Sequence, residues 1–529
     1  MSTALAVPRG PARVPLGIDI ALALAAGALH TLPFVFTQAW ALQLALVALL
    51  AWRCGAVRPR RAAALGLAFG TAWLGAGTWW MYISLHRYGG LPAPLAGLAV
   101  LGLCAVLSLY LAGAMALYAH GAPRRPGADA LRFAACWLLA ELARGVLFTG
   151  FPWIASGYAH VDGPLAALAP WIGVYGMGFV AALAGALLAP RRRVWRCGAR
   201  ALWAPLAGLA LLVLPALTGP GQFTRPTARL DVTLLQTDVP QDEKFSLDRM
   251  PQTLAWLAEQ LLAAKSALVV APETAIPLLP EQLDTAYWQP LVQRFTAGGQ
   301  AALIGLPLGS FEHGYTNSVV GLSREAAAAG ALNEGLPAGS YRYDKHHLVP
   351  FGEFIPNGFH WFTELMNIPL GDFSRGPLAA PSFPVRGERI APNICYEDLF
   401  GEELAARFAD AAQAPTIFAN VSNIGWFGDT VAIPQHLNIS RLRTLEFQRP
   451  MLRATNTGAT AVIDHRGRIT AALPPFTQGV LDAAVQGREG LTPYARWCAA
   501  LGLAPLLALG VLIVALTRAR RPGAPRTGT

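Results

Sequence analysis

Charged side chains are scarce in this chain of 529 residues, of which they make up 14%. Soluble domains carry about 25% charged residues. The deficit is concentrated in residues 1–220, which hold long, nearly uncharged runs, whereas residues 228–486 have the composition of a water-soluble domain. The scarcity of charge therefore excludes a protein that is soluble throughout, and it predicts a membrane protein with one soluble domain.

Lysine is scarcer still, with three residues among 41 cationic side chains. The formal net charge of +10 would suit a protein that binds nucleic acid. Most of the arginines, however, stand in short clusters beside apolar runs, which is a pattern of membrane topology and not of an anion-binding face. We therefore expect no nucleic-acid partner.

Apolar runs approach the ~20 residues that span the hydrocarbon of a bilayer. They lie near 17–36, 39–53, 62–85, 92–120, 129–149, 164–190, 199–218 and 493–517. The second run is short and could be a hairpin partner of the first. We predict an α-helical polytopic membrane domain of about eight transmembrane helices together with a soluble α/β domain. The expected order is a transmembrane domain at 1–222, an extracytoplasmic domain at 228–486, a last transmembrane helix at 490–520 and a cytoplasmic tail at 521–529.

The arginine clusters predict the orientation of these spans. They collect on one side of the membrane, and the opposite short loops hold little beyond Arg87. Positively charged loops stay in the cytoplasm, so both termini are expected there and residues 228–486 outside. In a bacterium, this places the soluble domain on the periplasmic side of the inner (cytoplasmic) membrane.

Cysteine is scarce as well, and Cys395 is alone in residues 228–486. An oxidising compartment favours paired cysteines. Because Cys395 has no second cysteine in its domain, it cannot form a disulfide there. It is either a buried, inert hydrophobic side chain or a nucleophile. The ten histidines show no HExxH or similar spacing. We therefore expect no metal, and no cofactor is implied.

Residues 228–486 alternate short apolar strands with helical stretches, which predicts an α/β domain. The strand "LVVAPET" finishes on Glu273, and "RIAPNIC" finishes on Cys395. Lys345, in "YRYDKHHLVPFGEFIP", is either a solvated surface charge or a compact ammonium kept for a site. Together, a carboxylate base, an ammonium that stabilises an oxyanion and a thiol nucleophile would make a catalytic set.

The segments around these three residues resemble a known superfamily. "APET", "YDKHHLVPFGEFIP" and "NICYED", in this order, are similar to the carbon–nitrogen hydrolase (nitrilase) superfamily. With the predicted spans, and with further matches at 77–90, 141–158 and 420–464, most of the chain resembles the apolipoprotein N-acyltransferase family. The resemblance implies an αββα sandwich as the scaffold of the soluble domain.

The resemblance also implies roles for individual residues. It implies Cys395 as the nucleophile, Glu273 as the general base and Lys345 as the stabiliser of tetrahedral intermediates. Supporting or substrate-binding roles are implied for Glu353, Tyr396, Glu397, Phe245 and Trp426, and the alternative for Trp426 is packing in the core. Two positions depart from the family pattern. Phe245 stands where the family often has Trp, and Ile424 replaces a carboxylate, so we assign Ile424 no catalytic role.

The implied reaction is a ping-pong acyl transfer in a lipid environment. Cys395 would take an acyl chain from a phospholipid, and the α-amine of a diacylglyceryl-cysteine at the N-terminus of an apolipoprotein would then accept it. The expected partners are this donor, this acceptor and membrane lipids, and the default oligomeric state is a monomer.

The stretch after Glu353, "FIPNGFHWFTELMNIPLGDFSRG", is aromatic and apolar. An exposed apolar patch of this kind marks an interaction site. We expect a lid that touches acyl chains through Phe359, Trp361 and Phe362, and the alternative is a buried loop of the sandwich.

Two other functions compete with the acyltransferase. A membrane-tethered, nitrilase-type amidase acting on a small amide would need fewer spans than this chain has. A transporter would place charged groups near the middle of the bilayer, and the predicted spans hold almost none.

Overall fold

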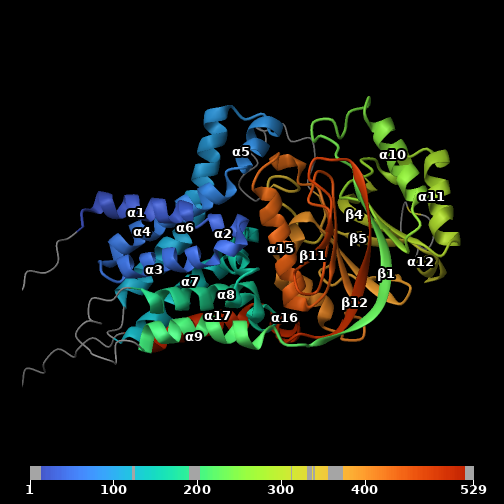
Figure 1. The fold of residues 1–529 in the computed structure, drawn as a ribbon. Coiled ribbons are helices and arrows are strands. Elements are labelled where there is room, and N and C mark those ends of the chain that lie inside the picture. The colour runs from blue at the N-terminus through green and yellow to red at the C-terminus, as the bar shows by residue number, and fades with distance from the viewer. Residues whose placement is uncertain are drawn as a thin grey trace, which may run out of the picture.

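The computed structural model describes residues 14–121, 125–189, 203–310, 312–329, 336, 340–355 and 373–518. A helical bundle lies beside an α/β domain (Figure 1). The C-terminal helix α17 (Ala504–Leu516) returns to the bundle and packs against α7 (Pro126–Val146). The bundle is therefore built from both ends of the chain.

In the described residues, the seven apolar runs before the soluble domain form nine helices, because the runs 17–36 and 62–85 are each divided into two helices. Besides α7 these are α1 (Leu16–Leu29), α2 (Leu32–Val35), α3 (Trp40–Cys54), α4 (Pro59–Thr78), α5 (Met81–Ile83), α6 (Ala93–His120), α8 (Ala169–Leu188) and α9 (Trp203–Thr218). In the part of the chain that the structure describes, three helical segments are long and apolar enough to cross a membrane: Leu16–Val35, Ala93–His120 and Pro164–Leu188. The prediction of a helical membrane domain is thus supported, in this coarser form.

The last apolar run differs from the single helix expected at 490–520. It forms α16 (Pro493–Leu501) and α17, which meet at an angle of 88°. Gly502 between them has φ +55°, a left-handed conformation that ends α16 and that glycine adopts without strain. Pro505 then suits the first turn of α17, because that turn needs no backbone N–H donor there. The pair is a candidate for one broken span.

The α/β domain contains two six-stranded sheets, with strand orders β12-β1-β2-β3-β4-β5 and β11-β10-β9-β8-β7-β6. The strands are β1 (Thr224–Gln236), β2 (Leu268–Val270), β3 (Ala301–Ser310), β4 (Gly314–Leu322), β5 (Tyr341–Asp344), β6 (Phe383–Val385), β7 (Glu388–Ile394), β8 (Ile417–Ser422), β9 (Met451–Thr455), β10 (Ala461–Ile463), β11 (Ile469–Ala472) and β12 (Gly479–Gly490). In each sheet three neighbouring strands are parallel, β1-β2-β3 and β7-β8-β9. Their continuous apolar sequences suit strands that are buried on both faces.

The two sheets pack face to face, with helices on the outside. Val270 and Leu303 of the first sheet share one buried apolar core with Val421 and Leu452 of the second. Helices α10 (Met250–Ala263) and α11 (Thr285–Ala297) cover the first sheet, and α15 (Ala432–Phe447) lies beside the second (Figure 1). This arrangement is the αββα sandwich that the resemblance implied.

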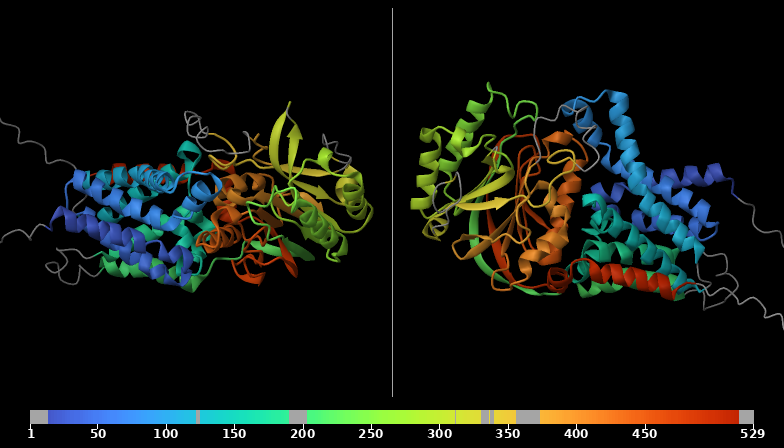
Figure 2. Two further views of the ribbon diagram at one scale, coloured as in Figure 1. Left: turned by 90° about the horizontal axis from the view of Figure 1, so that it is seen from above. Right: turned by 180° about the vertical axis from the view of Figure 1, so that it is seen from behind.

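Helix α15 lies between the second sheet and the bundle, as both Figure 1 and the right view of Figure 2 show. Thirteen of its 16 residues are buried although many are polar. The side-chain oxygen of Gln435 accepts hydrogen bonds from the indole N–H groups of Trp80 (3.2 Å) and Trp153 (2.8 Å) of the bundle. The soluble domain is therefore packed on the bundle through a buried polar contact and does not hang from it as a tethered module.

Candidate active site

Cys395 directly follows β7, at the carboxyl end of a parallel strand. Its backbone has φ +51°, a value that is uncommon for a residue with a Cβ and that occurs at strained functional turns. The side chain is half-buried. The turn from β7 into the short 3-10 helix Cys395–Leu399 therefore sets the direction of the thiol.

Glu273 follows β2 of the first sheet and is buried, with 8% of its surface exposed. One carboxylate oxygen accepts a hydrogen bond from the side-chain amide of Asn317 (2.8 Å), and the other from the backbone N–H of Asn423 (2.7 Å). Asn423 follows β8 of the second sheet. The carboxylate thus bridges the two sheets at the edge where their parallel strands end, and two neutral donors help to set its orientation.

Lys345 follows β5 and is only 1% exposed, so the alternative of a solvated surface charge is wrong. Its ammonium donates to Glu353 (2.8 Å) and lies 3.4 Å from an oxygen of Glu273. Burial would lower the pKa of Lys345, but the two carboxylates outweigh it and hold the pKa well above its usual value. The side chain therefore remains a cation and can stabilise a developing oxyanion.

The thiol of Cys395 is protonated at neutral pH in the resting protein. Burial raises its pKa to about 12; the negative charge of Glu273 raises it as well, and the positive charge of Lys345 acts in the opposite direction. A thiol with this pKa reacts as a nucleophile when a base removes its proton during bond formation. The arrangement can therefore perform general-base-assisted attack by a thiol.

The predicted supporting carboxylates fasten the loops of the site. Glu353 accepts from the side-chain amide of Asn317 (2.7 Å) as well as from Lys345. Glu397, two residues after Cys395, accepts from the backbone N–H of Ile394 (2.6 Å) and of His346 (2.7 Å). Glu397 thereby connects the turn at Cys395 to the loop that carries Lys345.

Tyr396, Phe245 and Trp426 lie in three different surroundings. The hydroxyl of Tyr396 donates to the backbone carbonyl of Gly150 in the bundle (3.0 Å). Phe245 is 46% exposed, and the half-buried Trp426 packs edge-on against Tyr88 with ring centroids 5.5 Å apart. The lid residues Phe359, Trp361 and Phe362 lie outside the described residues.

A second buried lysine, Lys244, lies at the site and was not predicted from the sequence. Lys244 is 7% exposed, and its ammonium donates to the backbone carbonyl of Glu273 (3.1 Å). Burial lowers the pKa of Lys244 to about 8, against the opposing charges of Glu273 and Cys395. The scarcity of lysine was the available signal, because two of the three lysines of the chain lie at this site. Asn317 and Asn423 had no such signal.

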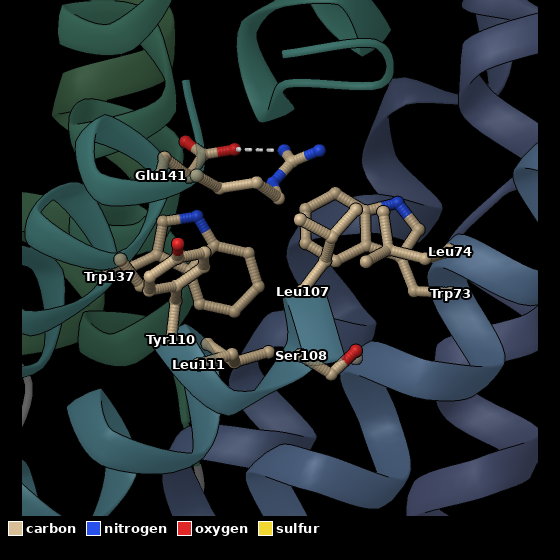
Figure 3. A pocket seen from close by; sticks show the side chains of 11 residues that line it. Trp73, Leu74, Leu107, Ser108, Tyr110, Leu111, Trp137 and Glu141 are labelled. Atoms are coloured by element: carbon tan, nitrogen blue, oxygen red, sulfur yellow. Dashed lines mark ion pairs between the residues drawn. The ribbon is translucent and has the colours of Figure 1, made fainter. Parts of the chain in front are cut away.

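A pocket with one charged end lies in the bundle. It lies between α4, α6 and α7, and Figure 3 shows Glu141 at one end of it and Ser108 at the other. Arg144 forms an ion pair with Glu141 (3.7 Å) and donates to the backbone carbonyl of Phe151 (3.0 Å). The charged end of the pocket thus holds the loop whose Gly150 receives the hydroxyl of Tyr396. Across the described ranges, no group of three or more His, Cys, Asp or Glu side chains is placed to hold a metal ion.

Comparison with known proteins identifies the family of the chain. Two family models match the chain, the apolipoprotein N-acyltransferase N-terminal domain over residues 26–187 and carbon-nitrogen hydrolase over residues 232–494. The apolipoprotein N-acyltransferase of Verminephrobacter eiseniae is 54% identical over 88% of this chain and 89% of its own length. That of Ralstonia nicotianae is 46% identical over 98% of this chain and 97% of its own.

A solved structure, the NitFhit protein of C. elegans, is 15% identical with a TM-score of 0.37, over 51% of this chain and 63% of that chain. The family assignment rests instead on the relatives that match along nearly the whole chain. This chain belongs to the apolipoprotein N-acyltransferase family.

Proposed function

We propose that this protein is a phospholipid–apolipoprotein N-acyltransferase that works through a thioester on Cys395. The observation that carries the proposal is the meeting of three side chains at one edge of the sandwich. There the carboxylate of Glu273 raises the pKa of the Cys395 thiol and the buried ammonium of Lys345 lowers it. The ammonium also lies 3.4 Å from an oxygen of Glu273. The N-acyltransferase activity of the relatives named above supports the choice of reaction.

The first half-reaction transfers the acyl chain to the enzyme. Glu273 takes the thiol proton while the sulfur of Cys395 attacks the ester carbonyl carbon of a phospholipid. Lys345 stabilises the oxyanion of the tetrahedral intermediate. The carbon–oxygen bond then breaks, the leaving alkoxide takes the proton from Glu273, and a lysophospholipid departs.

The second half-reaction transfers the acyl chain to the lipoprotein. The α-amine of the N-terminal S-diacylglyceryl-cysteine attacks the thioester carbonyl, and Glu273 accepts a proton from the nitrogen. The carbon–sulfur bond breaks, the sulfur regains a proton, and the product is an amide. No cofactor is needed, because both steps exchange one acyl bond for another.

The proposed membrane arrangement extends the three apolar helices to eight spans. The additional spans would be α3, α4, α7, α9 and the bent pair α16–α17. The arginine clusters support cytoplasmic termini and a periplasmic site on the inner membrane of a bacterium. The amidase alternative is weaker, because a tether would not need the buried contacts of Gln435 and Tyr396 with the bundle.

Replacement of the nucleophile tests the proposal. We expect Cys395→Ala to lower lipoprotein N-acylation by at least ~1,000-fold, because the covalent route is lost. Mass spectrometry of wild-type protein incubated with phospholipid vesicles alone should find one acyl chain on the peptide that carries Cys395. Cys498→Ala, at a buried cysteine of α16, serves as the matched control and should keep both signals. Retained N-acylation in Cys395→Ala would refute the thioester mechanism, and turnover of a small amide without acyl-enzyme would favour the amidase.

A further inference from the structure

A fully buried polar cluster lies directly behind the nucleophile turn. Its members come from four elements: Asp398 follows Cys395, His436 and Ser440 lie on α15, Asn420 on β8 and Arg453 on β9. All five are at most 1% exposed. Buried ionisable groups need hydrogen-bond and charge partners inside the protein. The hydrogen bonds of each side chain therefore indicate the role of the cluster.

The hydrogen bonds of His436 define its tautomer. Arg453 has only donors, and it lies 2.8 Å from Nδ1 of His436, so Nδ1 must accept. The proton of the neutral ring is therefore on Nε2, which lies 2.9 Å from an oxygen of Asp398 and 3.2 Å from the backbone carbonyl oxygen of Cys395. Burial and the charge of Arg453 lower the pKa of His436, which agrees with a neutral ring. Neither ring nitrogen is free to act as a base on the thiol.

The carbonyl oxygen of Cys395 receives a second donor. The side-chain amide of Asn420 donates to it (3.3 Å) and to the side-chain oxygen of Asn393 (2.7 Å). Two side chains from different elements thus hold the peptide group that follows the nucleophile. Cys395 itself has φ +51°, a backbone conformation that persists only where the surrounding structure enforces it.

The rest of the cluster anchors these two donors. Arg453 donates to Asn420 (3.1 Å) and to the hydroxyl of Ser440 (2.7 Å). That hydroxyl in turn donates to Asp398 (2.5 Å), whose carboxylate lies 3.6 Å from Arg453. The charges of Asp398 and Arg453 balance, so the cluster is neutral as a whole and its geometry is fixed by directed bonds.

We propose that His436 and Asn420 are positioning residues that hold the carbonyl of Cys395 and thereby keep its thiol directed at Glu273 and Lys345. The inference rests on the proposed function in one respect, that Cys395 is the nucleophile. Asp398, together with Arg453 and Ser440, then keeps His436 in the tautomer that donates to this carbonyl.

The position of His436 also connects the nucleophile to the bundle. The preceding residue, Gln435, accepts a hydrogen bond from the indole N–H of Trp153. The ring centroids of Trp153 and His436 are 5.4 Å apart. Adjacent residues of α15 therefore reach in two directions, one to the bundle and one to the nucleophile turn.

The test measures the reactivity of Cys395 with iodoacetamide at pH 9 in the full-length protein in detergent, with the alkylated peptide identified by mass spectrometry. His436→Phe keeps the ring shape and loses the donor, and we expect alkylation of Cys395 to slow by between about 10- and 100-fold. His436→Gln can still donate to the carbonyl and accept from Arg453, so its rate should stay within about threefold of wild type. His465→Phe, at the turn between β10 and β11, is the matched control and should leave the rate unchanged.

A second variant covers the case in which His436→Phe fails to fold. Asn420→Leu has nearly the same size, removes the other donor to the same carbonyl and should slow alkylation in the same direction. For acyl transfer, the variants should lower kcat and leave the KM for phospholipid within about twofold, because the substrate contacts are unchanged.

The outcomes separate this inference from the proposed function. Wild-type alkylation rates in folded His436→Phe and in Asn420→Leu would overturn the positioning role, and so would equal losses in His436→Phe and His436→Gln. Alkylation does not depend on any acyl donor. A protein that lacks N-acyltransferase activity but shows the expected alkylation pattern would therefore refute the proposed function and keep the positioning role.

Discussion

At the scale of single residues, the site combines one thiol with two carboxylates and two ammonium groups. Glu273 and Glu353 share Lys345 and the side chain of Asn317, so neither carboxylate is left without a partner. The charge of Glu273 raises the pKa of Cys395, and that of Lys345 lowers it. Burial raises this pKa most, so the proposed nucleophile is a protonated thiol at neutral pH, which is less open to oxidation than a thiolate would be.

Opposite effects on thiol reactivity are expected from the two charged neighbours. Glu273→Gln removes a negative charge, lowers the pKa of Cys395, raises the thiolate fraction at a given pH and so speeds alkylation by iodoacetamide. Lys345→Met removes a positive charge and should slow alkylation. Below a pKa of about 12, each rate should rise about tenfold per pH unit, because the thiolate is the reactive species.

Acyl transfer should be lost in both variants, by roughly 100- to 10,000-fold for Glu273→Gln, since the base is missing. The measurement is the alkylation rate between pH 7 and 9 beside a lipoprotein acylation assay, with thermal unfolding as the control for folding. Equal alkylation rates in the two variants would contradict the electrostatic account.

At the scale of elements, α15 connects the site to the membrane part. It packs on the second sheet on one side and against the bundle on the other (Figures 1 and 2). Most of its polar side chains therefore need partners inside the protein. Gln435 supplies one such contact, because its side-chain oxygen accepts from Trp153 and its amide donates to the carbonyl of Gly77 (3.0 Å).

Loss of the Gln435 contact should destabilise the packing of α15 on the bundle. In Gln435→Leu, the buried indole N–H of Trp153 loses the partner seen in the structure, which costs about 1–3 kcal/mol. We expect a lower midpoint of thermal unfolding in detergent. Gln486→Leu, at an exposed position of β12, is the control and should change stability by no more than about 0.5 kcal/mol. An unchanged midpoint for Gln435→Leu would show that the contact is dispensable.

At the scale of the whole molecule, the proposed orientation places the sandwich and the arginine-rich loops on opposite sides of the membrane. We expect Leu247→Cys, which is 83% exposed in the soluble domain, to react with a membrane-impermeant maleimide in intact spheroplasts. Arg58→Cys, exposed between α3 and α4, should react only after permeabilisation. A Cys395→Ala background removes the native thiol of the soluble domain. Reaction of both positions, or of Arg58→Cys alone, in intact spheroplasts would overturn the orientation.

Much of the architecture could be predicted, and the predictable parts share one property. In the described residues, the apolar runs before the soluble domain are helical, and the strands predicted before Glu273 and Cys395 are present, although β2 ends at Val270 and β7 at Ile394. These features follow from local periodicity and from runs of one kind of residue. The bend at Gly502 could not be predicted in the same way, because a glycine inside an apolar run is also compatible with an unbroken helix.

The sequence by itself determined the division into apolar and soluble parts and the residue types of the proposed catalytic set, Glu273, Lys345 and Cys395. Only the tertiary structure decided that Lys244 is buried beside them and that Glu397 connects two loops of the site by hydrogen bonds. It also decided that a polar helix, α15, lies between a sheet and the bundle. The physical reason is that local pattern reports what a segment can form, whereas burial and pairing depend on which distant segments meet. The carbonyl of Cys395, held by His436 from another element, is a contact of this second kind.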